Sequence, residues 1–566
     1  MTRAELLAQG ADLERRLGSP QDHASVTGFR AALSADEHER FPDDAWDALV
    51  GLGYFELFVP PDLGGRFSQL SELLLMGRLV ARRDLALAIA AGQCLLGALP
   101  VWIAGSPALR ERQAALLLGG QAGALALTEE AHGSDLAGGE VQALSSAPGA
   151  FTLTGAKWCI NNATRGHSLT VLARTDPAGG PRGFSLLFLD KQALGEAGQL
   201  TRYVPLPKLR TQGIRAADIS GARFDQLEVP HAALVGKPGR GLDVVLRTLQ
   251  VSRTLCAAFS LGAADSALRA ALDFVTTRRL YGEDLIALPA VRRLIARASL
   301  HLHQADALAL LVCRLAGEVP EQLSVLSAVV KLAVPALCQR VIDDAMTLLG
   351  ARYYLREEPF AHVQKLCRDA ALVTLFDGSA EVNRHVIAGQ LSALVSARAS
   401  ERATRGEHAR ASLQRAAALD QPESPLALEN LRTSARGGDD VLNALTGLPP
   451  AHPIAVAVAG FDERVRQAQA AGSEPRDATF FELADDYVRL VTSAALEHVR
   501  RGAAPEGSFG AGLSDAEHEA WLRGALSPEA QRAIDATGLH ERAVTHTLRE
   551  HAAGRLFGAI PVELAR

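Results

Sequence analysis

Residues 125–135 read Leu-Ala-Leu-Thr-Glu-Glu-Ala-His-Gly-Ser-Asp and mark the point at which the character of the sequence changes. Upstream, apolar residues recur with a spacing near 3.6, which predicts helices over residues 4–16, 36–52, 69–82, 85–98 and 108–119. Downstream, β-branched and aromatic segments bounded by Gly, Pro and Asp predict strands at 151–155, 169–173, 184–189 and 222–229. The stretch 125–135 therefore joins a helical region to a β-region.

Long helical patterns return after residue 240. Their spacing predicts helices at 241–279, 288–316, 321–350 and 366–398, and four such helices with short joints favour a bundle. Pro335 is expected to kink the third helix or to mark a boundary in it. The polar stretch 399–425 is interpreted as a linker, and further amphipathic helices are expected at 425–445, 479–501, 514–524 and 528–558.

These patterns predict a mostly α fold with a central β-domain. The expected domains are an N-terminal helical domain (1–123), a central β-domain (124–235), a four-helix bundle (236–400), and a linker with an additional C-terminal helical domain (401–566). The formal net charge of −6 argues against nucleic-acid binding, and residues 401–566 carry 18 Lys+Arg against 24 Asp+Glu. An acidic C-terminal region also lacks electrostatic attraction to an anionic membrane.

Cysteine usage and the N-terminal sequence favour a cytoplasmic protein. The six cysteines show no CxxC spacing and are interpreted as thiols of a reducing compartment. No basic segment followed by an apolar run is visible at the N-terminus, so no secretory signal is expected. Residues 85–109 are uncharged, but Gln93, Pro100 and several glycines favour a buried helix over an integral membrane segment.

Five short motifs occur in a fixed order. Residues 125–135 are followed by Leu-Thr-Gly-Ala-Lys-Trp-Cys-Ile-Asn-Asn (153–162), Gln-Gly-Ile-Arg (212–215), Arg-Arg-Leu-Tyr-Gly (278–282), and Leu-Cys-Arg-Asp-Ala (366–370) leading into Phe-Asp-Gly-Ser-Ala-Glu (376–381). In this order and on this helix–β–helix pattern, they resemble the acyl-CoA dehydrogenase family over residues 20–395. The C-terminal extension is placed like that of the very-long-chain acyl-CoA dehydrogenases.

The resemblance implies that FAD is the cofactor. The positions of Leu127 and Thr128 would face the isoalloxazine ring, and Ser134 would lie toward the pyrophosphate and the substrate. A Thr hydroxyl and backbone N–H groups can hydrogen-bond N5, O4 and O2 of a flavin. Cys159 and Asn161 occupy positions where the family has Trp and Thr beside the flavin. Trp158 stands one residue early, and side-chain alternation would turn it to the opposite face of a strand.

Other residues would contact FAD through the helical part of the chain. The resemblance implies that Arg278 and Tyr281 reach the FAD of a neighbouring subunit, for which a planar guanidinium is suited. Thr347 and Gly350 match a glycine-rich segment near the adenosine half, although only one of three glycines is retained. Ser379 and Glu381 complete the implied cofactor-binding set. Without the resemblance, Arg278 would be a surface residue near a helix end.

The resemblance also implies a base. Phe-Asp-Gly-Ser (376–379) matches the family's Tyr-Glu-Gly-Thr, so Asp377 would remove the α-proton of an acyl thioester while flavin N5 accepts the β-hydride. Ser252 stands where some members carry an alternative Glu. Arg253, Gly378 and Ser134 would lie against the substrate. The side chain of Asp377 is one methylene shorter than that of Glu. Without the resemblance, Asp377 and Gly378 would be interpreted as an ordinary turn, because Asp-Gly pairs are common in turns.

The expected activity is that of an acyl-CoA dehydrogenase-like oxidoreductase of fatty acid metabolism. The resemblance implies an acyl-CoA or carrier-bound substrate, an electron-transferring flavoprotein as acceptor, and a homodimer or homotetramer. The alternatives are an Asp-base flavin oxidase or oxygenase of the same fold, such as a nitroalkane-oxidase-like or secondary-metabolism enzyme, and a catalytically degenerate scaffold. His301 and His303 point about 200° apart on a helix, so no metal site is expected and both are interpreted as exposed or capping residues.

Overall fold

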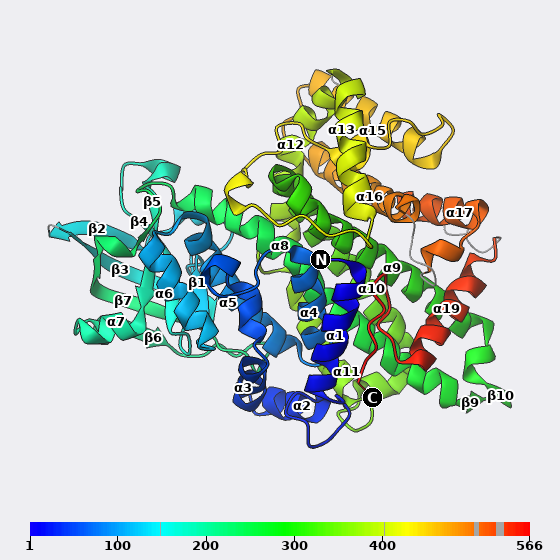
Figure 1. The fold of residues 1–566 in the computed structure, drawn as a ribbon, viewed down its shortest axis with the longest axis horizontal. Coiled ribbons are helices and arrows are strands. Elements are labelled where there is room, and N and C mark those ends of the chain that lie inside the picture. The colour runs from blue at the N-terminus through cyan, green and yellow to red at the C-terminus, as the bar shows by residue number, and fades with distance from the viewer. Residues whose placement is uncertain (148, 401, 503–508, 528–536, 566) are drawn as a thin grey trace. The chain divides into compact units, whose positions relative to one another are not determined.

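The computed structural model describes residues 1–147, 149–400, 402–502, 509–527 and 537–565. The chain divides into two compact units, whose elements are labelled in Figure 1. The helical unit comprises Met1–Arg30, Gln69–Leu85 and Arg253–Arg566. The sheet unit comprises Ala31–Ser68 and Ala86–Ser252. A mostly helical chain with a β-sheet domain in the middle of its sequence is thus the fold class expected from the sequence.

An eight-stranded sheet forms the centre of the sheet unit. Its strand order is β6-β7-β3-β2-β4-β5-β8, and β1 pairs in parallel with β4 outside this path. The long strands β3 and β7 are antiparallel partners. The strands are β1 (Gly123–Ala126), β2 (Gln142–Ala147), β3 (Ala150–Asn161), β4 (Ser168–Arg174), β5 (Phe184–Asp190), β6 (Tyr203–Leu206), β7 (Ile219–Pro230) and β8 (Leu234–Val235).

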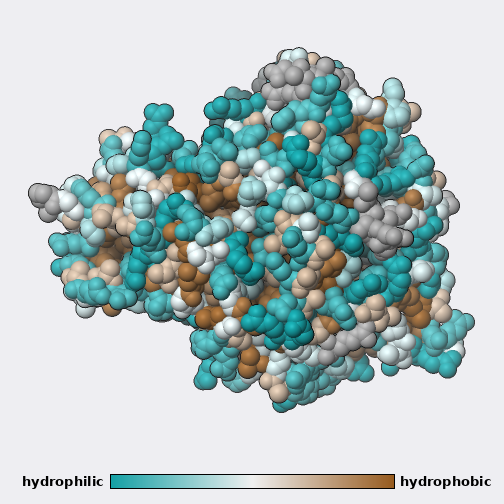
Figure 2. Space-filling view, viewed as in Figure 1, coloured by the Kyte–Doolittle hydropathy of each residue, from teal (hydrophilic) through white to brown (hydrophobic). Residues whose placement is uncertain are grey.

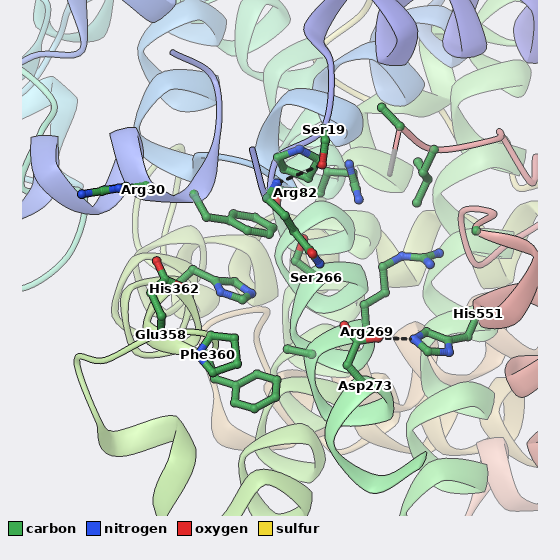
Figure 3. A pocket seen from close by; sticks show the side chains of 18 of the residues that line it. Ser19, Arg30, Arg82, Ser266, Arg269, Asp273, Glu358, Phe360, His362 and His551 are labelled. Carbon is green, nitrogen blue, oxygen red and sulfur yellow. Dashed lines mark hydrogen bonds and ion pairs between the residues drawn. The ribbon is translucent and has the colours of Figure 1, made fainter. Parts of the chain in front are cut away.

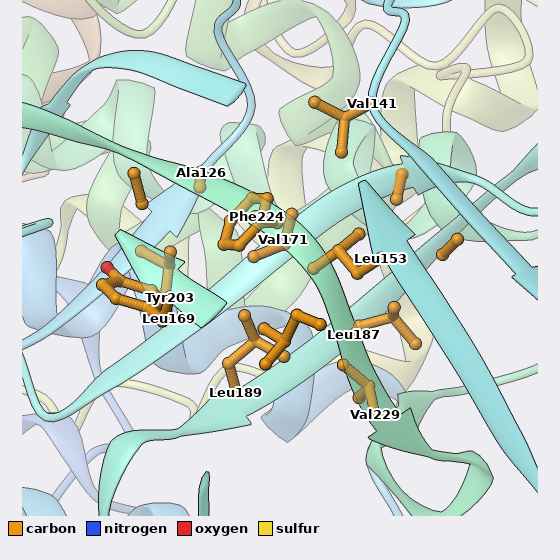
Figure 4. Close-up of a cluster of buried hydrophobic side chains, with 14 of the residues drawn as sticks. Ala126, Val141, Leu153, Leu169, Val171, Leu187, Leu189, Tyr203, Phe224 and Val229 are labelled. Carbon is orange, nitrogen blue, oxygen red and sulfur yellow. The ribbon is translucent and has the colours of Figure 1, made fainter. Parts of the chain in front are cut away.

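Apolar side chains from strands β1 to β7 gather in one buried cluster (Figure 4). Leu153 of β3, Val171 of β4, Leu187 of β5 and Phe224 of β7 are fully buried. Burial of each such side chain stabilises the fold by about 1.5–3 kcal/mol. The strands expected at 151–155, 169–173, 184–189 and 222–229 lie within or largely overlap β3, β4, β5 and β7.

The helix α5 (Leu85–Ala104) lies against the strand that precedes the Thr128 loop. A Cβ at Gly97 would come within 2.7 Å of the Ala124 backbone, so only glycine permits this approach. The Thr170 hydroxyl donates to the Gly97 carbonyl at 2.8 Å and fixes the same contact from β4. The sheet unit also contains α3 (Asp43–Gly51), α6 (Pro107–Leu118) and α7 (Lys191–Glu196).

The single helix expected at 36–52 is wrong. The chain forms α2 (Phe29–Glu37) and α3 instead, and the break falls at Glu39–Pro42. Glu39 has a left-handed φ of 51°, and Pro42 cannot donate the N–H that a continuing helix requires. Asp36 and the Arg215 guanidinium form an ion pair just before this break.

The helical unit is built on long helices that pack side by side. They are α8 (Gly241–Thr277), α9 (Pro289–Glu318), α10 (Leu323–Leu349) and α12 (Ala380–Ser400), with α1 (Arg3–Leu17) and α4 (Leu70–Ala81) from the N-terminal part. The chain continues as helix through Pro335, so the boundary considered there does not occur. A short antiparallel pair, β9 (Arg279–Leu280) with β10 (Glu283–Asp284), separates α8 from α9.

The helix expected at 366–398 is divided into two. α11 (Ala361–Ala371) ends in a 3₁₀ turn (Leu372–Thr374), and α12 starts at Ala380. Between them Asp377 and Gly378 have φ values of 55° and 102°. Left-handed residues cannot belong to a right-handed helix, so the helical periodicity on both sides concealed the break.

The C-terminal part of the helical unit differs from the sequence expectation in two segments. The presumed linker contains α13 (Arg402–Ala417), whose Ala409, Leu413 and Ala416 are buried at spacings of four and three. The helix expected at 425–445 is wrong, because only α14 (Asp440–Asn443) forms there. Helices α16 (Ala478–Arg501) and α17 (Asp515–Leu526) match expectation, α15 (Pro453–Ala470) was not anticipated, and α19 (Leu539–Ala553) lies in the range 528–558, whose residues 528–536 are outside the described chain.

Three helices of the described chain are long and apolar enough to cross a bilayer by length and composition. They include Leu85–Ala104 and Gly241–Thr277, and the third comprises Pro320–Tyr354. Between 78% and 83% of each apolar window is buried inside the protein. On the face shown in Figure 2, hydrophilic residues predominate and hydrophobic ones are scattered among them.

The last residues of the chain bind a group of buried charges. Asp306 of α9 accepts from Arg78 Nη1 at 2.6 Å through Oδ1 and from the Ala559 backbone N–H at 2.8 Å through Oδ2. Asp265 of α8 accepts from the Phe557 N–H at 3.1 Å. Because buried charges must be paired, the C-terminal segment completes a polar network that the helices alone leave incomplete.

His303 is half-buried within a group of aromatic rings, whereas the sequence analysis expected an exposed or capping residue. Its ring stacks on Phe509 with centroids 4.9 Å apart and lies 5.3 Å from the His546 ring. Burial holds the pKa of His303 well below its ordinary range and lowers that of His546 to about 4. Both imidazoles are therefore neutral near pH 7 and pack as aromatic rings between α9 and the C-terminal segments.

Replacement of Asp306 by alanine should lower the free energy of unfolding by about 3 kcal/mol, because the buried Arg78 guanidinium loses the closer of its two carboxylates, at 2.6 Å, and keeps only Asp265 at 3.7 Å. Urea unfolding monitored by circular dichroism measures this loss. Glu541→Ala is the matched control, because its ion pair with Arg292 is largely exposed and should contribute less than about 1 kcal/mol. Equal losses in the two variants would contradict the role given to the buried network.

Acidification should weaken the fold through His303 and His546. Their folded-state pKa values lie below the ordinary 6.5 of an unfolded chain, so the folded protein binds fewer protons. The contribution of these two histidines to the free energy of unfolding should therefore be complete above pH 6.5 and should fall as the pH drops toward 4. A His303→Leu/His546→Leu variant should lose less stability between pH 7 and pH 5 than the parent protein, and an unchanged pH slope would contradict this assignment.

Candidate functional site

In the sheet unit, the Thr128 loop lies beside β3. The Trp158 backbone N–H donates to the Thr128 carbonyl at 3.0 Å. This bond brings the residues expected to face the flavin, Leu127 and Thr128, next to the strand that carries Cys159 and Asn161. Ser134 follows in an exposed loop, where Asp135 Oδ1 accepts from the Gly138 N–H at 3.1 Å.

A buried ion pair that the sequence analysis missed holds this loop. Lys157 Nζ donates to Glu129 Oε1 at 2.7 Å and to the Leu127 carbonyl at 2.8 Å. Glu129 also accepts the N–H groups of Glu140 and Val141 at 2.7 and 3.2 Å. Burial would raise the pKa of Glu129, but the ammonium of Lys157 and these N–H groups outweigh it and lower the pKa.

The only available signal for this pair in the sequence was position. Glu129 follows Thr128 directly, and Lys157 lies two residues beyond the strand predicted at 151–155. A lysine in a β-segment is normally solvated, so nothing in the local pattern distinguished it.

A β-bulge occurs at Cys159. Trp158 is paired with Gly221 and Ile160 with Ser220, so Cys159 is an extra residue on β3. Its φ is 58° and its side chain is exposed, whereas Trp158 is half-buried. Bulges re-aim side chains, so the simple alternation used for Trp158 and Cys159 does not apply at this point of the strand.

Asn161 presents an unpaired amide. It is 8% exposed, and among the described residues neither Nδ2 nor Oδ1 has a hydrogen-bond partner. Buried amides in native proteins are nearly always paired. An amide with one free acceptor and free donors, on the strand next to the Thr128 loop, suits the alternating polar edge of an isoalloxazine ring. The residues present in the sheet unit therefore fit FAD.

In the helical unit, the Asp377–Gly378 turn is held from two sides. Arg253 Nε donates to the Asp377 carbonyl at 2.8 Å. Asn383 Nδ2 donates to the carbonyls of Gly378 and Ser379, each at 2.9 Å. A Cβ at Gly378 would come within 3.1 Å of Arg253 Nη2, which explains the small residue after the acid. Arg253 is 5% exposed, and burial lowers its pKa.

The Asp377 carboxylate lies among residues that the sequence analysis did not select. Cys256 Sγ is 3.7 Å from Asp377 Oδ2. Lys331 is 3% exposed; its Nζ donates to the Val373 carbonyl at 2.5 Å and lies 5.3 Å from the Phe376 ring centroid. Burial lowers the pKa of Lys331, while the nearby acidic groups act in the opposite sense.

Four other sequence-predicted residues of the helical unit are exposed, near helix ends or in the β9–β10 hairpin. Arg278 is exposed at the end of α8, and Tyr281 is 93% exposed at the tip of the β9–β10 hairpin with a φ of 55°. Thr347 Oγ1 donates to the Asp343 carbonyl at 2.9 Å near the end of α10, and Gly350 follows with a φ of 57°.

Ser379 and Glu381 begin α12. The Ser379 hydroxyl accepts from the Val382 N–H at 3.4 Å as a capping group. Glu381 is exposed and accepts from Arg384 Nη1 at 2.6 Å, and Arg384 also donates to Asp485. Both residues therefore have structural partners in the part of the chain that is described.

A separate cavity of about 720 Å³ opens elsewhere in the helical unit (Figure 3). Phe29 and His362 stack with centroids 4.0 Å apart at one wall, and His551 contacts Asp273 at 2.9 Å at another. Arg82 and Arg269 also line it, but Glu14 and Asp265 already pair with them. The cavity shares no residue with the Asp377 turn.

Comparison with known proteins assigns the chain to a family. Residues 29–121, 124–227 and 239–392 match the models of the N-terminal, middle and C-terminal domains of acyl-CoA dehydrogenase. The probable acyl-CoA dehydrogenase FadE25 of Mycobacterium tuberculosis is 27% identical over 361 residues, which are 64% of this chain and 90% of that protein. Cyclohex-1-ene-1-carbonyl-CoA dehydrogenase of Geobacter metallireducens is 28% identical over 361 residues, covering 63% of this chain and 91% of that protein.

Solved structures share this fold, and the match to one of them extends over the C-terminal region. An acyl-CoA dehydrogenase from Bacillus anthracis in complex with FAD has a TM-score of 0.71 and 17% identity, covering 99% of this chain and 92% of that one. Butyryl-CoA dehydrogenase from Megasphaera elsdenii has a TM-score of 0.61 and 24% identity, covering 68% and 97%. The chain therefore belongs to the acyl-CoA dehydrogenase family, the flavin oxidoreductases that use FAD and act on CH–CH bonds.

Proposed function

We propose that the protein catalyses the α,β-dehydrogenation of an acyl thioester in fatty acid metabolism, with Asp377 as the base. The observation that carries this proposal is the turn at Asp377, where Arg253 and Asn383 hold the backbone and leave a carboxylate between α11 and α12. Relatives that are named acyl-CoA dehydrogenases support a CoA thioester as substrate. The electrons would pass on to an electron-transferring flavoprotein.

Bound FAD would supply a hydride acceptor at N5 of its ring. The residues of the chain have two tasks. In the sheet unit, the Thr128 hydroxyl and the Asn161 amide would hold the polar edge of the ring, with Leu127 and Cys159 beside it and Ser134 toward the pyrophosphate. In the helical unit, Asp377 would accept the α-proton, which it does only if its carboxylate stays ionised and close to the substrate carbon.

The exposure of the β9–β10 hairpin supports the proposal that the enzyme is an oligomer. Tyr281 is a large aromatic side chain that is 93% exposed beside the cationic Arg278. Exposed aromatic and arginine side chains are enriched at protein interfaces. We therefore assign Arg278, Tyr281, Thr347 and Gly350 to the FAD of a neighbouring copy in a homodimer or homotetramer.

Replacement of Asp377 by asparagine tests the base. The amide keeps the size of the side chain but cannot accept the proton, so the rate of flavin reduction should fall by about 10²–10⁴-fold while FAD stays bound. Anaerobic stopped-flow mixing with a series of acyl-CoAs, followed at the flavin absorbance, measures this rate. Asp377→Glu should keep or raise the rate with simple acyl-CoAs.

Asp343→Asn is the matched control, since this carboxylate is exposed on α10. An Asp377→Asn variant that reduces flavin at the wild-type rate would reject Asp377 as the base. Rapid reoxidation of the reduced flavin by oxygen, or turnover of a nitroalkane, would favour the oxidase alternative over the dehydrogenase. A loss of turnover in Asp377→Glu would indicate a pocket built for the shorter acid.

Replacement of Lys157 by methionine should lower both stability and FAD content. It leaves Glu129 buried without its ammonium partner, which costs about 3 kcal/mol, and it releases the Leu127 carbonyl next to the flavin-facing residues. Urea unfolding and the flavin absorbance of the purified protein measure the two effects.

The double variant Lys157→Met/Glu129→Gln should recover part of the stability, because no unpaired charge remains. Lys208→Met is the control, since Lys208 is an exposed lysine of the same unit that also donates to backbone carbonyls. Full FAD occupancy in Lys157→Met would show that the pair does not organise the cofactor site.

A further inference from the structure

The thiol of Cys256 lies against the carboxylate of Asp377. The distance between Sγ and Oδ2 is 3.7 Å, within the range of a hydrogen bond to sulfur. Cys256 follows Arg253 by three residues on α8, so both side chains lie on the same face of that helix. Arg253 therefore contacts the backbone of the turn while Cys256 contacts its carboxylate.

The direction of this hydrogen bond follows from protonation. Cys256 is 1% exposed, and burial raises the pKa of its thiol, which the Asp377 charge raises further. The thiol therefore remains protonated near neutral pH. An ionised carboxylate has only acceptor sites, so the thiol is the donor and Oδ2 is the acceptor.

We propose that Cys256 is a positioning residue that holds Oδ2 of Asp377 and leaves Oδ1 to take the α-proton of the substrate. No hydrogen bond to Oδ1 occurs among the residues that the structure describes. The bond fixes the rotation of the carboxylate about the Cβ–Cγ bond, which is otherwise soft. This inference rests on the proposed function, because the reacting oxygen is defined by the reaction.

Two further charged groups face this carboxylate. Arg253 of α8 and Lys331 of α10 both act on Cys256 electrostatically, together with Asp377 itself. Both cations are buried, and both use a nitrogen to hold a backbone carbonyl, of Asp377 and of Val373 respectively. A substitution at Cys256 leaves both cations in place, so a change in the rate of flavin reduction reports the loss of the thiol.

The hydrogen bond can be tested without turnover. The S–H stretching band of Cys256 in the holoenzyme is identified as the infrared intensity that is lost in Cys256→Ala. In Asp377→Asn this band should move to higher frequency and sharpen, because a neutral amide is a weaker acceptor than a carboxylate. An S–H band that is the same in wild type and Asp377→Asn overturns the proposal, whatever the activity of either protein.

The positioning role is tested by kinetics. Flavin reduction in Cys256→Ala should be about tenfold slower, the effect of losing a hydrogen bond of about 1.4 kcal/mol, with little change in substrate Kd. Cys256→Ser keeps a donor and should retain most of the rate.

Cys313→Ala is the matched control, because it removes an equally buried thiol from α9 and should leave the rate of flavin reduction unchanged. A wild-type rate of flavin reduction in Cys256→Ala overturns the positioning role. If the S–H band responds to Asp377→Asn but no acyl thioester reduces the flavin of the parent protein, the contact stands and the proposed function fails. The two failures are therefore distinguishable.

Discussion

The guanidinium of Arg253 holds the short segment on which the chemistry depends. Asp377 has a left-handed backbone, which costs an ordinary residue about 1–2 kcal/mol, and Gly378 continues in the same region. The hydrogen bonds from Arg253 to the Asp377 carbonyl and from Asn383 to the Gly378 carbonyl offset this cost. The left-handed backbone at Asp377 and Gly378 also separates α11 from α12, which starts at Ala380. The same backbone conformation therefore both interrupts the helix and positions the acid.

Each unit uses the same device. A buried cation donates to a backbone carbonyl next to a functional residue: Lys157 to Leu127, Arg253 to Asp377, and Lys331 to Val373. A charged donor makes a stronger hydrogen bond than a neutral one. A carbonyl carries no titratable proton, so its position does not change with pH as that of a carboxylate partner would. Buried cations are costly in isolation, and the carbonyl bonds are part of what makes their burial tolerable.

The parts of the structure that the sequence predicts well are those with uninterrupted periodicity. Phe151 and Leu153 are buried at alternate positions of β3. The long apolar stripes of α8, α9 and α10 could be predicted without knowing which elements pack against them. The register of Phe376-Asp377-Gly378-Ser379 was sufficient to select the candidate base. The failures lie where tertiary contacts decide. Three buried residues make α13 a helix despite its polar composition, and the position of His303 depends on its stacking against Phe509, which is distant in the sequence. Cys256 was unpredictable because its partner is 121 residues away in the chain.

The short side chain of Asp377 suits a turn that is held through its backbone carbonyl groups. Aspartate lacks one methylene of glutamate, about 1.5 Å of reach, but it also lacks one rotatable bond. Its carboxylate is located by the backbone and by two torsions, so fixing the backbone at the Asp377 carbonyl fixes most of the position of the acid. A longer side chain on the same turn would need additional contacts to lose its extra rotamers. In this chain the remaining freedom is one rotation about Cβ–Cγ, and a single donor at Oδ2, the Cys256 thiol, is enough to restrict it.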